Sequence, residues 1–172
     1  SGHVETVHSY TNDQNLLDNY HKSYRRGRSA PLNMVITETG AASAITKVIP
    51  QMAGKFTGNA VRVPTPDVSL AILNLNLTNE VSSIDEVNAI IRDAASYGDL
   101  VEQIDYSTSQ ELVSTDCVGN PHASILDSHA TLISPGKKSI VLYVWYDNEY
   151  GYTRQVIRLA KYLGKVQRLT YY

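Results

Sequence analysis

Several kinds of residue are scarce in this sequence, and each shortage argues against a class of protein. Cysteine occurs once in 172 residues, so no internal disulfide can form, which suits the reducing cytoplasm. Lysine and arginine number 15 against 17 acidic residues, so the formal charge of −2 gives no general attraction to nucleic acid or to a membrane. No apolar run approaches about 18 residues, so we expect no membrane span. We therefore expect a cytoplasmic protein with neither nucleic acid nor membrane as a partner.

Motifs for metals and for dinucleotides are missing as well. No glycine-rich turn follows a strand and opens a helix in the way that a dinucleotide-binding fold requires. The histidines other than His8 show none of the spacings typical of metal ligands, and they are His3, His21, His122 and His129. We expect no metal site and no dinucleotide-binding domain within the chain itself.

What is present predicts one globular domain over residues 1–165, followed by a tail at 166–172. Apolar residues make up 42% of the chain, enough for a packed core. Strand-like patterns occupy residues 1–11, 56–63, 68–77 and 138–145, with short strands near Ile104, Val113, Ile125 and Leu132. Helical spacing occupies 39–50, 83–97 (with Ser83 as its N-cap) and 149–163. The order of elements indicates an α+β fold, a large mixed or antiparallel sheet with helices packed on one face.

Candidate chemistry gathers near the first strand and in the long loop at 12–37. His8 ends the strand, and an imidazole of pKa near ~6.5 can act as a base at neutral pH. The run Arg25-Arg26-Gly27-Arg28 is either a solvated loop or an anion site, since guanidinium matches phosphate. Thr39 and Gly40 open a helix and offer donors at its positive end. Arg62 lies among apolar residues, where an unpaired charge is costly, so we favour a bound anion there.

Four segments together carry a specific pattern: Thr6–Thr11, Thr39–Ala42, Arg62–Pro66 and Trp145–Tyr152. In this order and at these separations they resemble the catalytic domain of phosphorylating glyceraldehyde-3-phosphate dehydrogenase. The resemblance covers residues 3–165 and implies NAD as cofactor, a phosphorylated aldehyde and inorganic phosphate as substrates, a role in glycolysis and a homotetramer. It also implies that the NAD-binding domain of such an enzyme is absent from this chain.

The resemblance further implies a role for each matching residue. His8 would take the proton of a cysteine thiol and later act as base while hydride leaves. Thr11 and Arg62 would hold the phosphate of the substrate, together with Asp13. Thr39, Gly40 and an arginine of the loop would hold inorganic phosphate. Both Arg25 and Arg26 fit that last position, and we favour Arg25.

The segment Trp145–Tyr152 would form the nicotinamide contact. The resemblance implies that Asn148 hydrogen-bonds the carboxamide of the nicotinamide. Judged from its sequence position alone, Asn148 is an ordinary turn residue. Tyr152 would pack near the same ring, and ordinary packing in the core is compatible with that role.

No residue of the chain matches the nucleophile of the family. Cys117 stands where the family usually has an aromatic residue, and a free cysteine is often a small buried apolar group. The Ser-Cys-Thr-Thr-Asn-Cys segment of the family, upstream of the histidine strand, is not found. We therefore expect the chain alone to be inactive. Two alternatives stay open: an erythrose-4-phosphate dehydrogenase, and a non-catalytic module that binds anions and self-associates.

Overall fold

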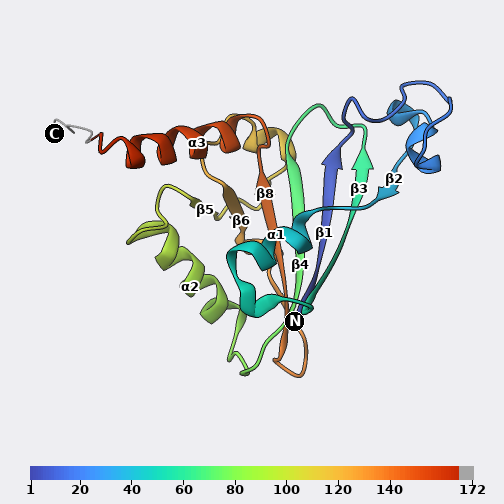
Figure 1. The fold of residues 1–172 in the computed structure, drawn as a ribbon. Coiled ribbons are helices and arrows are strands. Elements are labelled where there is room, and N and C mark those ends of the chain that lie inside the picture. The colour runs from blue at the N-terminus through green and yellow to red at the C-terminus, as the bar shows by residue number, and fades with distance from the viewer. Residues whose placement is uncertain (167–172) are drawn as a thin grey trace.

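The computed structural model describes residues 1–166 and shows a mixed sheet with helices packed against it (Figure 1). The described strands are β1 Gly2–Ser9, β2 Val35–Thr37, β3 Phe56–Val63, β4 Ser69–Asn76, β5 Ile104–Ser107, β6 Ser124–Asp127, β7 Leu132–Ile133 and β8 Ser139–Tyr146. The helices are α1 Ala41–Val48, α2 Ile84–Ser96 and α3 Tyr150–Leu163. Short 3-10 turns lie at η1 Tyr24–Gly27, η2 Ala30–Leu32, η3 Pro50–Met52, η4 Ser114–Cys117 and η5 Ser128–Ala130.

The strands follow the order β2-β3-β1-β4-β8-β6-β5, and β7 pairs with β8. β1 runs parallel to β3, and β5 runs parallel to β6, whereas the other pairs are antiparallel. The α+β class and the mixed sheet are confirmed. Because β1 and β3 are parallel neighbours, their carboxyl ends meet at one edge of the sheet, which is where Figure 1 shows the long loop after β1.

Strand register shows which face the helices cover. Register partners share a face, and one such row crosses the sheet through Gly58, Val4, Leu73 and Leu142. Helix α1 packs against this row at Gly58. The two backbones are so close there that a side-chain carbon at position 58 would lie 3.3 Å from Cβ of Ala42, a residue of α1. Helix α2 lies on it as well, because Val87 packs with Leu142 in the core. Both helices therefore cover the same face, as the sequence predicts.

Helix α2 begins at the residue that the sequence predicts. The hydroxyl of Ser83 accepts a hydrogen bond of 3.1 Å from the backbone N–H of Glu86, which makes Ser83 the N-cap. The carboxylate of Glu86 in turn accepts bonds from the backbone N–H and the hydroxyl of Ser82. These bonds hold the pKa of Glu86 below its usual range, through the hydroxyl first and then the N–H. The cap fixes how α2 enters the core.

Two expectations about secondary structure were wrong. The strand expected near Val113 is the turn η4, because the Asp116 carboxylate accepts a bond from the N–H of Val113 and closes a local turn. The loop at 12–37 contains a short strand, β2, which pairs with β3. Three residues are too few to show an alternating pattern. The expected tail at 166–172 lies outside the described residues, apart from Val166.

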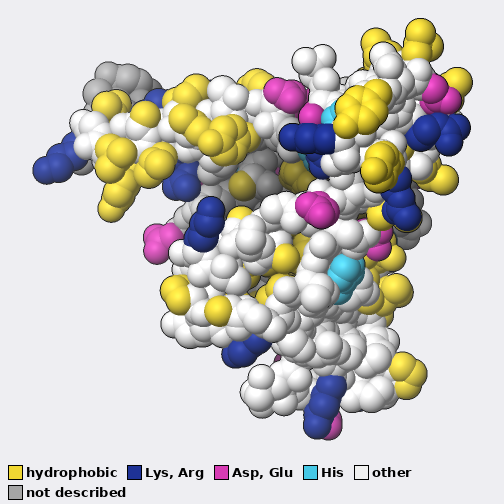
Figure 2. Space-filling model, turned by 45° about the vertical axis from the view of Figure 1, so that its right-hand side comes forward, with side chains coloured by type: hydrophobic (Ala, Val, Ile, Leu, Met, Phe, Trp, Pro, Cys, Tyr) yellow, Lys and Arg dark blue, Asp and Glu magenta, His cyan; other side chains and the backbone are white. Residues whose placement is uncertain are grey.

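Helix α3 follows β8 and runs away from the sheet at its upper edge (Figure 1). It leaves much of its apolar surface in solvent: Val156 is 47% exposed, Leu159 54% and Leu163 71%. Figure 2 shows hydrophobic side chains both along α3 and on the loop after β1. Within residues 1–166, no helix has the length and apolar character needed to cross a bilayer.

Candidate functional site

His8 and Arg62 come together at the edge where β1 and β3 end. They are register partners in parallel strands, so their side chains emerge side by side on the helix-covered face. An Nη1 atom of Arg62 lies 2.7 Å from Nδ1 of His8 and 3.0 Å from the carbonyl oxygen of Ser9. Nδ1 of His8 is itself 2.7 Å from that carbonyl. The pairing of the two strands thus brings a base and a cation into contact across 54 residues of sequence.

Two contacts at Nδ1 of His8 favour opposite tautomers of the ring. The carbonyl oxygen of Ser9 only accepts hydrogen bonds, so at 2.7 Å it favours a proton on Nδ1. Nη1 of Arg62 only donates, so at 2.7 Å it favours a lone pair on Nδ1 and the proton on Nε2. Both contacts orient the ring, and in the first tautomer Nε2 carries the lone pair that can accept a proton.

The surroundings of His8 also favour its neutral form. Burial is the main cause that lowers the pKa of His8, and the positive charge of Arg62 lowers it further. The hydrogen bond to Ser9 and the carboxylates of Glu149 and Asp67 oppose this shift without reversing it. His8 is therefore largely uncharged at neutral pH, as a general base must be.

A second cation, Arg26, reaches the same region from the loop. Its guanidinium forms an ion pair with Asp13, and its Nε donates to the hydroxyl of Thr37 at 2.9 Å. Arg26 holds the pKa of the Asp13 carboxyl below its usual range. Burial lowers the pKa of the Arg62 guanidinium, and the charge of Arg26 lowers it further, so the two arginines lie close enough to repel each other. Such a pair is stabilised by an anion held between the cations.

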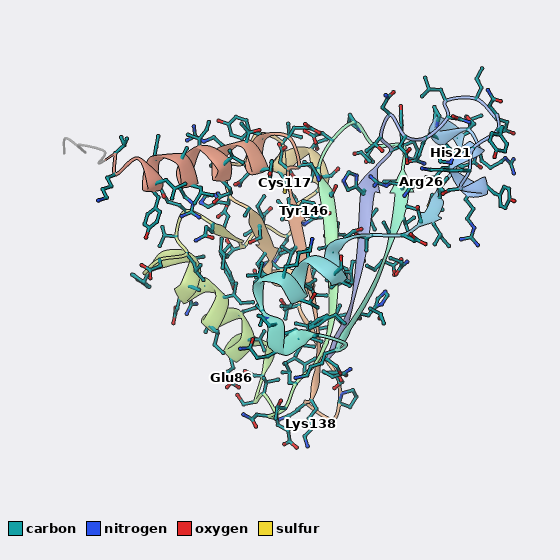
Figure 3. All side chains as sticks on the ribbon, viewed as in Figure 1. His21, Arg26, Glu86, Cys117, Lys138 and Tyr146 are labelled. Carbon is teal, nitrogen blue, oxygen red and sulfur yellow. The ribbon has the colours of Figure 1, made fainter. Side chains whose placement is uncertain are left out.

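The loop also contains His21, whose Nε2 lies 3.6 Å from a carboxylate oxygen of Asp13. Figure 3 shows His21 beside Arg26 in the loop region. Arg25, the arginine favoured from the sequence, is exposed instead, and within residues 1–166 its side chain makes no hydrogen bond or ion pair. Thr11 is also exposed, directly after β1. Of the two loop arginines, the structure therefore ties Arg26, and not Arg25, to β2, the strand that pairs with the strand carrying Arg62.

Thr39 and Gly40 form a separate group at the start of α1. The hydroxyl of Thr39 accepts a bond of 3.2 Å from the N–H of Ala41, and Gly40 is the exposed N-cap residue. The methyl group of Thr39 lies against Gly58, four residues before Arg62 on β3. At ~3.3 Å per residue, about 13 Å of strand separates the two places. The group at the start of α1 and the group around Arg62 are therefore two separate places on the chain.

Asn148 is fixed by a partner that the sequence did not single out. The hydroxyl of Ser69, which is only 1% exposed, donates a bond of 2.7 Å to Oδ1 of Asn148. The amide NH₂ of Asn148 is thereby left as a donor. The preceding Asp147 is 3% exposed and accepts bonds from the N–H groups of Gly119 and Tyr150, at 2.8 and 2.6 Å. Both bonds hold the turn between β8 and α3 in one conformation.

Tyr152 does not pack in the core. Its side chain is 71% exposed on α3, which removes ordinary core packing as an alternative role. The turn just before α3 carries the buried Asp147, whereas Tyr152 points into solvent and has room for a ligand or a partner.

Cys117 has none of the properties of a nucleophile. It is 1% exposed and packs with Val68 and Ile125. Burial, with the negative charge of Asp116 as a smaller cause, raises the pKa of its thiol to about 11. The thiol therefore stays protonated and unreactive at neutral pH. In residues 1–166, no group of at least three histidine, cysteine, aspartate or glutamate side chains is placed to hold a metal ion.

Sequence reasoning missed Ser69 and the carbonyl of Ser9, and it ranked Arg26 second. A serine at the start of a strand whose next four residues are apolar was the available signal for Ser69. The role of the Ser9 carbonyl has no sequence signal, because every residue carries this group. Tyr146 was passed over too. It lies in register with Ser69, and burial raises the pKa of its hydroxyl (Figure 3).

Comparison with known proteins identifies the family. Residues 1–148 match the family model for the C-terminal domain of glyceraldehyde 3-phosphate dehydrogenase. A glyceraldehyde-3-phosphate dehydrogenase-like protein of Pseudomonas aeruginosa (strain UCBPP-PA14) is 58% identical over 166 residues, which are 96% of this chain and 35% of that protein. Glyceraldehyde-3-phosphate dehydrogenase 1 of Bacillus subtilis (strain 168) is 48% identical over 95% of this chain and 48% of its own length. The enzyme of Geobacillus stearothermophilus is 44% identical over 95% of this chain and 48% of its length.

The chain thus spans between about a third and a half of these relatives. Together with the mixed sheet, the match over 148 residues places the chain in the glyceraldehyde-3-phosphate dehydrogenase family, as its C-terminal domain.

Proposed function

We propose that this chain is the catalytic domain of an NAD-dependent, phosphorylating glyceraldehyde-3-phosphate dehydrogenase of glycolysis. The observation that carries the proposal is the position of His8, whose ring is oriented at Nδ1 by the carbonyl of Ser9 and by Arg62, at the edge where β1 and β3 end. A lowered pKa keeps the ring neutral, and Arg62 lies in contact with it. A neutral imidazole beside an anion-binding cation suits proton removal from a phosphorylated substrate. The single buried thiol suits the reducing cytoplasm, where we place the reaction.

In this proposal each group has one task. Nε2 of His8 takes the proton of the attacking thiol and returns it to the alkoxide that forms when the thiolate adds to the aldehyde. It takes the proton of the resulting hydroxyl again as hydride leaves. Arg62 and Thr11 hold the phosphate of the substrate, with Asp13 orienting Arg26 toward it. Thr39 and Gly40 hold inorganic phosphate at the second position, at the start of α1. We assign the loop cation to Arg26, because Arg25 is turned into solvent.

The residues of the turn after β8 fit the nicotinamide part of NAD. Because Ser69 occupies Oδ1 of Asn148, the amide presents its NH₂ group, which matches the carbonyl oxygen of a carboxamide. Tyr152 has the exposed surface needed to contact the ring. When bound, NAD accepts the hydride that leaves the substrate carbon. The role of Asn148 is to orient the carboxamide, and the role of His8 is to remove the proton.

The nucleophile and most of the NAD site must come from residues outside this chain. Its one cysteine is buried and protonated, so it cannot attack an aldehyde. The relatives from Bacillus and Geobacillus are about twice as long as the part that matches. We expect the 172-residue chain to form no NADH from aldehyde, NAD and phosphate. NADH formation by the purified chain would show that the site is assembled differently.

The test of the proposal uses the complete protein that carries this chain, with His8→Asn as the variant and His3→Asn as its control. Both histidines lie on β1, and His3 lies near the opposite end of the strand. Loss of a general base lowers turnover by roughly 10²–10⁴-fold, so we expect a loss of this size for His8→Asn alone. Near-normal turnover would refute the base assignment. If the protein turned over erythrose 4-phosphate better than glyceraldehyde 3-phosphate, it would be assigned as an erythrose-4-phosphate dehydrogenase instead.

We also propose that the protein forms a homo-oligomer, a tetramer in its complete form. The loop after β1 exposes large apolar side chains, which is unfavourable in a monomer. They are Leu16, Leu17, Tyr20, Tyr24, Leu32 and Met34. Contact between loops of neighbouring subunits would bury them and hold Arg26 in place. Sedimentation would show an assembly of identical subunits, whereas a monomer at all concentrations would contradict this proposal.

A further inference from the structure

A groove separates α3 from the loops around β5 and β6, away from the edge that carries His8. Its volume is about 500 Å³, within the range of roughly 300–1,000 Å³ that is usual for small-molecule sites. It lies between the inner side of α3 and two short segments, residues 101–102 and 121–122. None of the residues assigned above to substrate, phosphate or nicotinamide lines it.

Basic side chains dominate the α3 wall of this groove. Arg154, Arg158 and Lys161 follow one another at spacings of four and three residues, so they share one side of the helix. The groove's other charged residues are Glu102 and, when protonated, His122. Among residues 1–166, none of the three cations forms an ion pair with a carboxylate. A local excess of positive charge therefore stands on a chain whose net charge is −2.

One glutamine builds the floor of the groove. The side-chain Nε2 of Gln155 donates to the carbonyls of Glu102 and Pro121, at 2.9 and 3.0 Å, and so ties α3 to both loops. Its Oε1 accepts a bond of 2.9 Å from Nε of Arg158. The amide is thus fully used, and Arg158 is held by one nitrogen while its two Nη groups stay available. Arg154 also lies over the ring of Tyr150, 5.9 Å from its centroid. These contacts order Arg154 and Arg158 before any ligand arrives.

The same groove has an apolar part. Val101 and Pro121 on the loop side face Ile157 and Tyr162 of α3. Figure 2 shows basic and hydrophobic side chains interspersed along this helix. Apolar and aromatic surface beside fixed donors is the usual composition of a site for an organic anion.

The groove is distinct from the other exposed apolar surface of α3. Tyr152, Val156, Leu159 and Leu163 repeat at spacings of four, three and four residues, two positions out of step with the cations. At ~100° per residue, two positions place this row about 200° away, on the opposite side of the helix. A partner that covers the apolar row would therefore leave the groove open.

We propose that this groove binds an organic diphosphate, a molecule with two linked phosphates and a flat, largely apolar body. The cations extend over about 10 Å of helix, too far for a single phosphate to reach all of them. Two linked phosphates can engage Arg158 together with either neighbour through charge-assisted bonds. The body of the molecule then lies between Pro121 and Tyr162. The site lies beyond the proposed dehydrogenase reaction and does not depend on it.

ADP is a suitable probe, with adenosine and inorganic pyrophosphate as its two halves. Calorimetry of the full 172-residue chain should give binding for ADP, weaker binding for pyrophosphate and none for adenosine. The double variant Arg158→Ala, Lys161→Ala should weaken ADP binding by at least about tenfold. The matched control is Arg92→Ala, Lys138→Ala, which also removes two cations but from surface ion pairs outside the groove. It should leave the affinity within about twofold.

Amide shifts in NMR spectra locate the probe without any variant. We expect ADP to shift the signals of residues 101–102, 121–122 and 154–162, with the side-chain amide of Gln155 among the most affected. Shifts at Thr39 and Arg62 instead would mean that ADP had entered the substrate phosphate positions, which overturns the proposal. Three other results would also overturn the proposal. They are a wild-type chain that does not bind ADP, a groove variant that binds ADP as tightly as the wild type, and pyrophosphate that binds as tightly as ADP.

Discussion

The buried hydroxyl of Ser69 holds the side-chain oxygen of Asn148 at 2.7 Å, across 79 residues of sequence. The antiparallel pairing of β4 and β8 creates this contact, because Ser69 is in register with Tyr146, two residues before Asn148. Ser69 is 1% exposed, so the bond is favoured once formed, since its hydroxyl finds no water there. The contact fixes which end of the amide faces outward, and this end decides what Asn148 can recognise.

We predict that Ser69→Ala releases the Asn148 amide. In the chain alone, the side-chain NH₂ signals of Asn148 should broaden or move toward their values in unfolded peptides. In the complete protein, turnover should fall by roughly tenfold as the donor loses its fixed direction. Ser139→Ala is the matched control, because its hydroxyl makes the same bond, at 2.8 Å, to Oδ1 of Asn76 on the same two strands. Equal effects of both variants on turnover would remove the special role of Ser69.

We predict that His8 titrates below the usual pKa of histidine, near ~6.5, because burial disfavours its charged form and Arg62 repels it. NMR titration of the ring protons measures this directly, with the exposed His129 as an internal comparison. Arg62→Gln removes the like charge and should raise the pKa of His8 toward the usual value. A pKa for His8 that is unchanged in this variant would show that Arg62 does not act on it.

The same shift has a consequence for stability. Because the pKa of folded His8 is lowered, the unfolded chain binds the proton more readily between that lowered pKa and ~6.5. The stabilisation from neutral His8 is therefore fully present above ~6.5 and declines as the pH falls toward the folded pKa. Denaturant unfolding of the wild type and of His8→Gln should show a pH dependence in this window that the variant lacks. Identical slopes would contradict the coupling.

Much of the fold was accessible from the sequence because periodic patterns reflect burial on one face. Alternation predicted β4 and β8, and helical spacing with the Ser83 cap predicted α2. η4 was missed because a side-chain bond to the N–H of Val113 overrides the β preference of valine. α3 was predicted as a helix, but its exposure was not, since a pattern shows that a face is apolar and not what covers it.

The site could be predicted only in part, for a similar reason. His8 and Arg62 were found by resemblance and by chemistry, and the parallel pairing of β1 and β3 then explains why they meet. The choice between Arg25 and Arg26 depends on the turn η1, where neighbouring residues point in different directions. Sequence spacing gives no information about which of the two turns inward. The Ser69 contact depends on strand register, which a single sequence does not specify.

We predict that Cys117 resists alkylation in the native chain. With 1% exposure and a pKa raised to about 11, the thiol is both covered and protonated at pH values near 8. Iodoacetamide followed by mass spectrometry should find it unmodified in buffer and fully modified in denaturant. Cys117→Ala should leave the turnover of the complete protein nearly unchanged, at a small cost in stability. Rapid native alkylation, or loss of turnover in this variant, would reopen the question of the nucleophile.

Val68 has a backbone φ of 65°, in the left-handed region that a β-branched residue rarely adopts. It is 4% exposed and directly precedes Ser69, so the strained residue sets the start of β4 beneath Asn148. We predict that Val68→Gly is at least as stable as Val68→Ala. Both variants lose the two methyl groups of valine, and glycine loses Cβ as well, but glycine alone relieves the strain. At Val4, equally buried within β1, glycine should instead be less stable than alanine by about 1 kcal/mol. Urea unfolding of these four variants measures the difference in free energy of unfolding between glycine and alanine at each position. If alanine were the more stable residue at position 68 as well as at position 4, Val68 would store no strain.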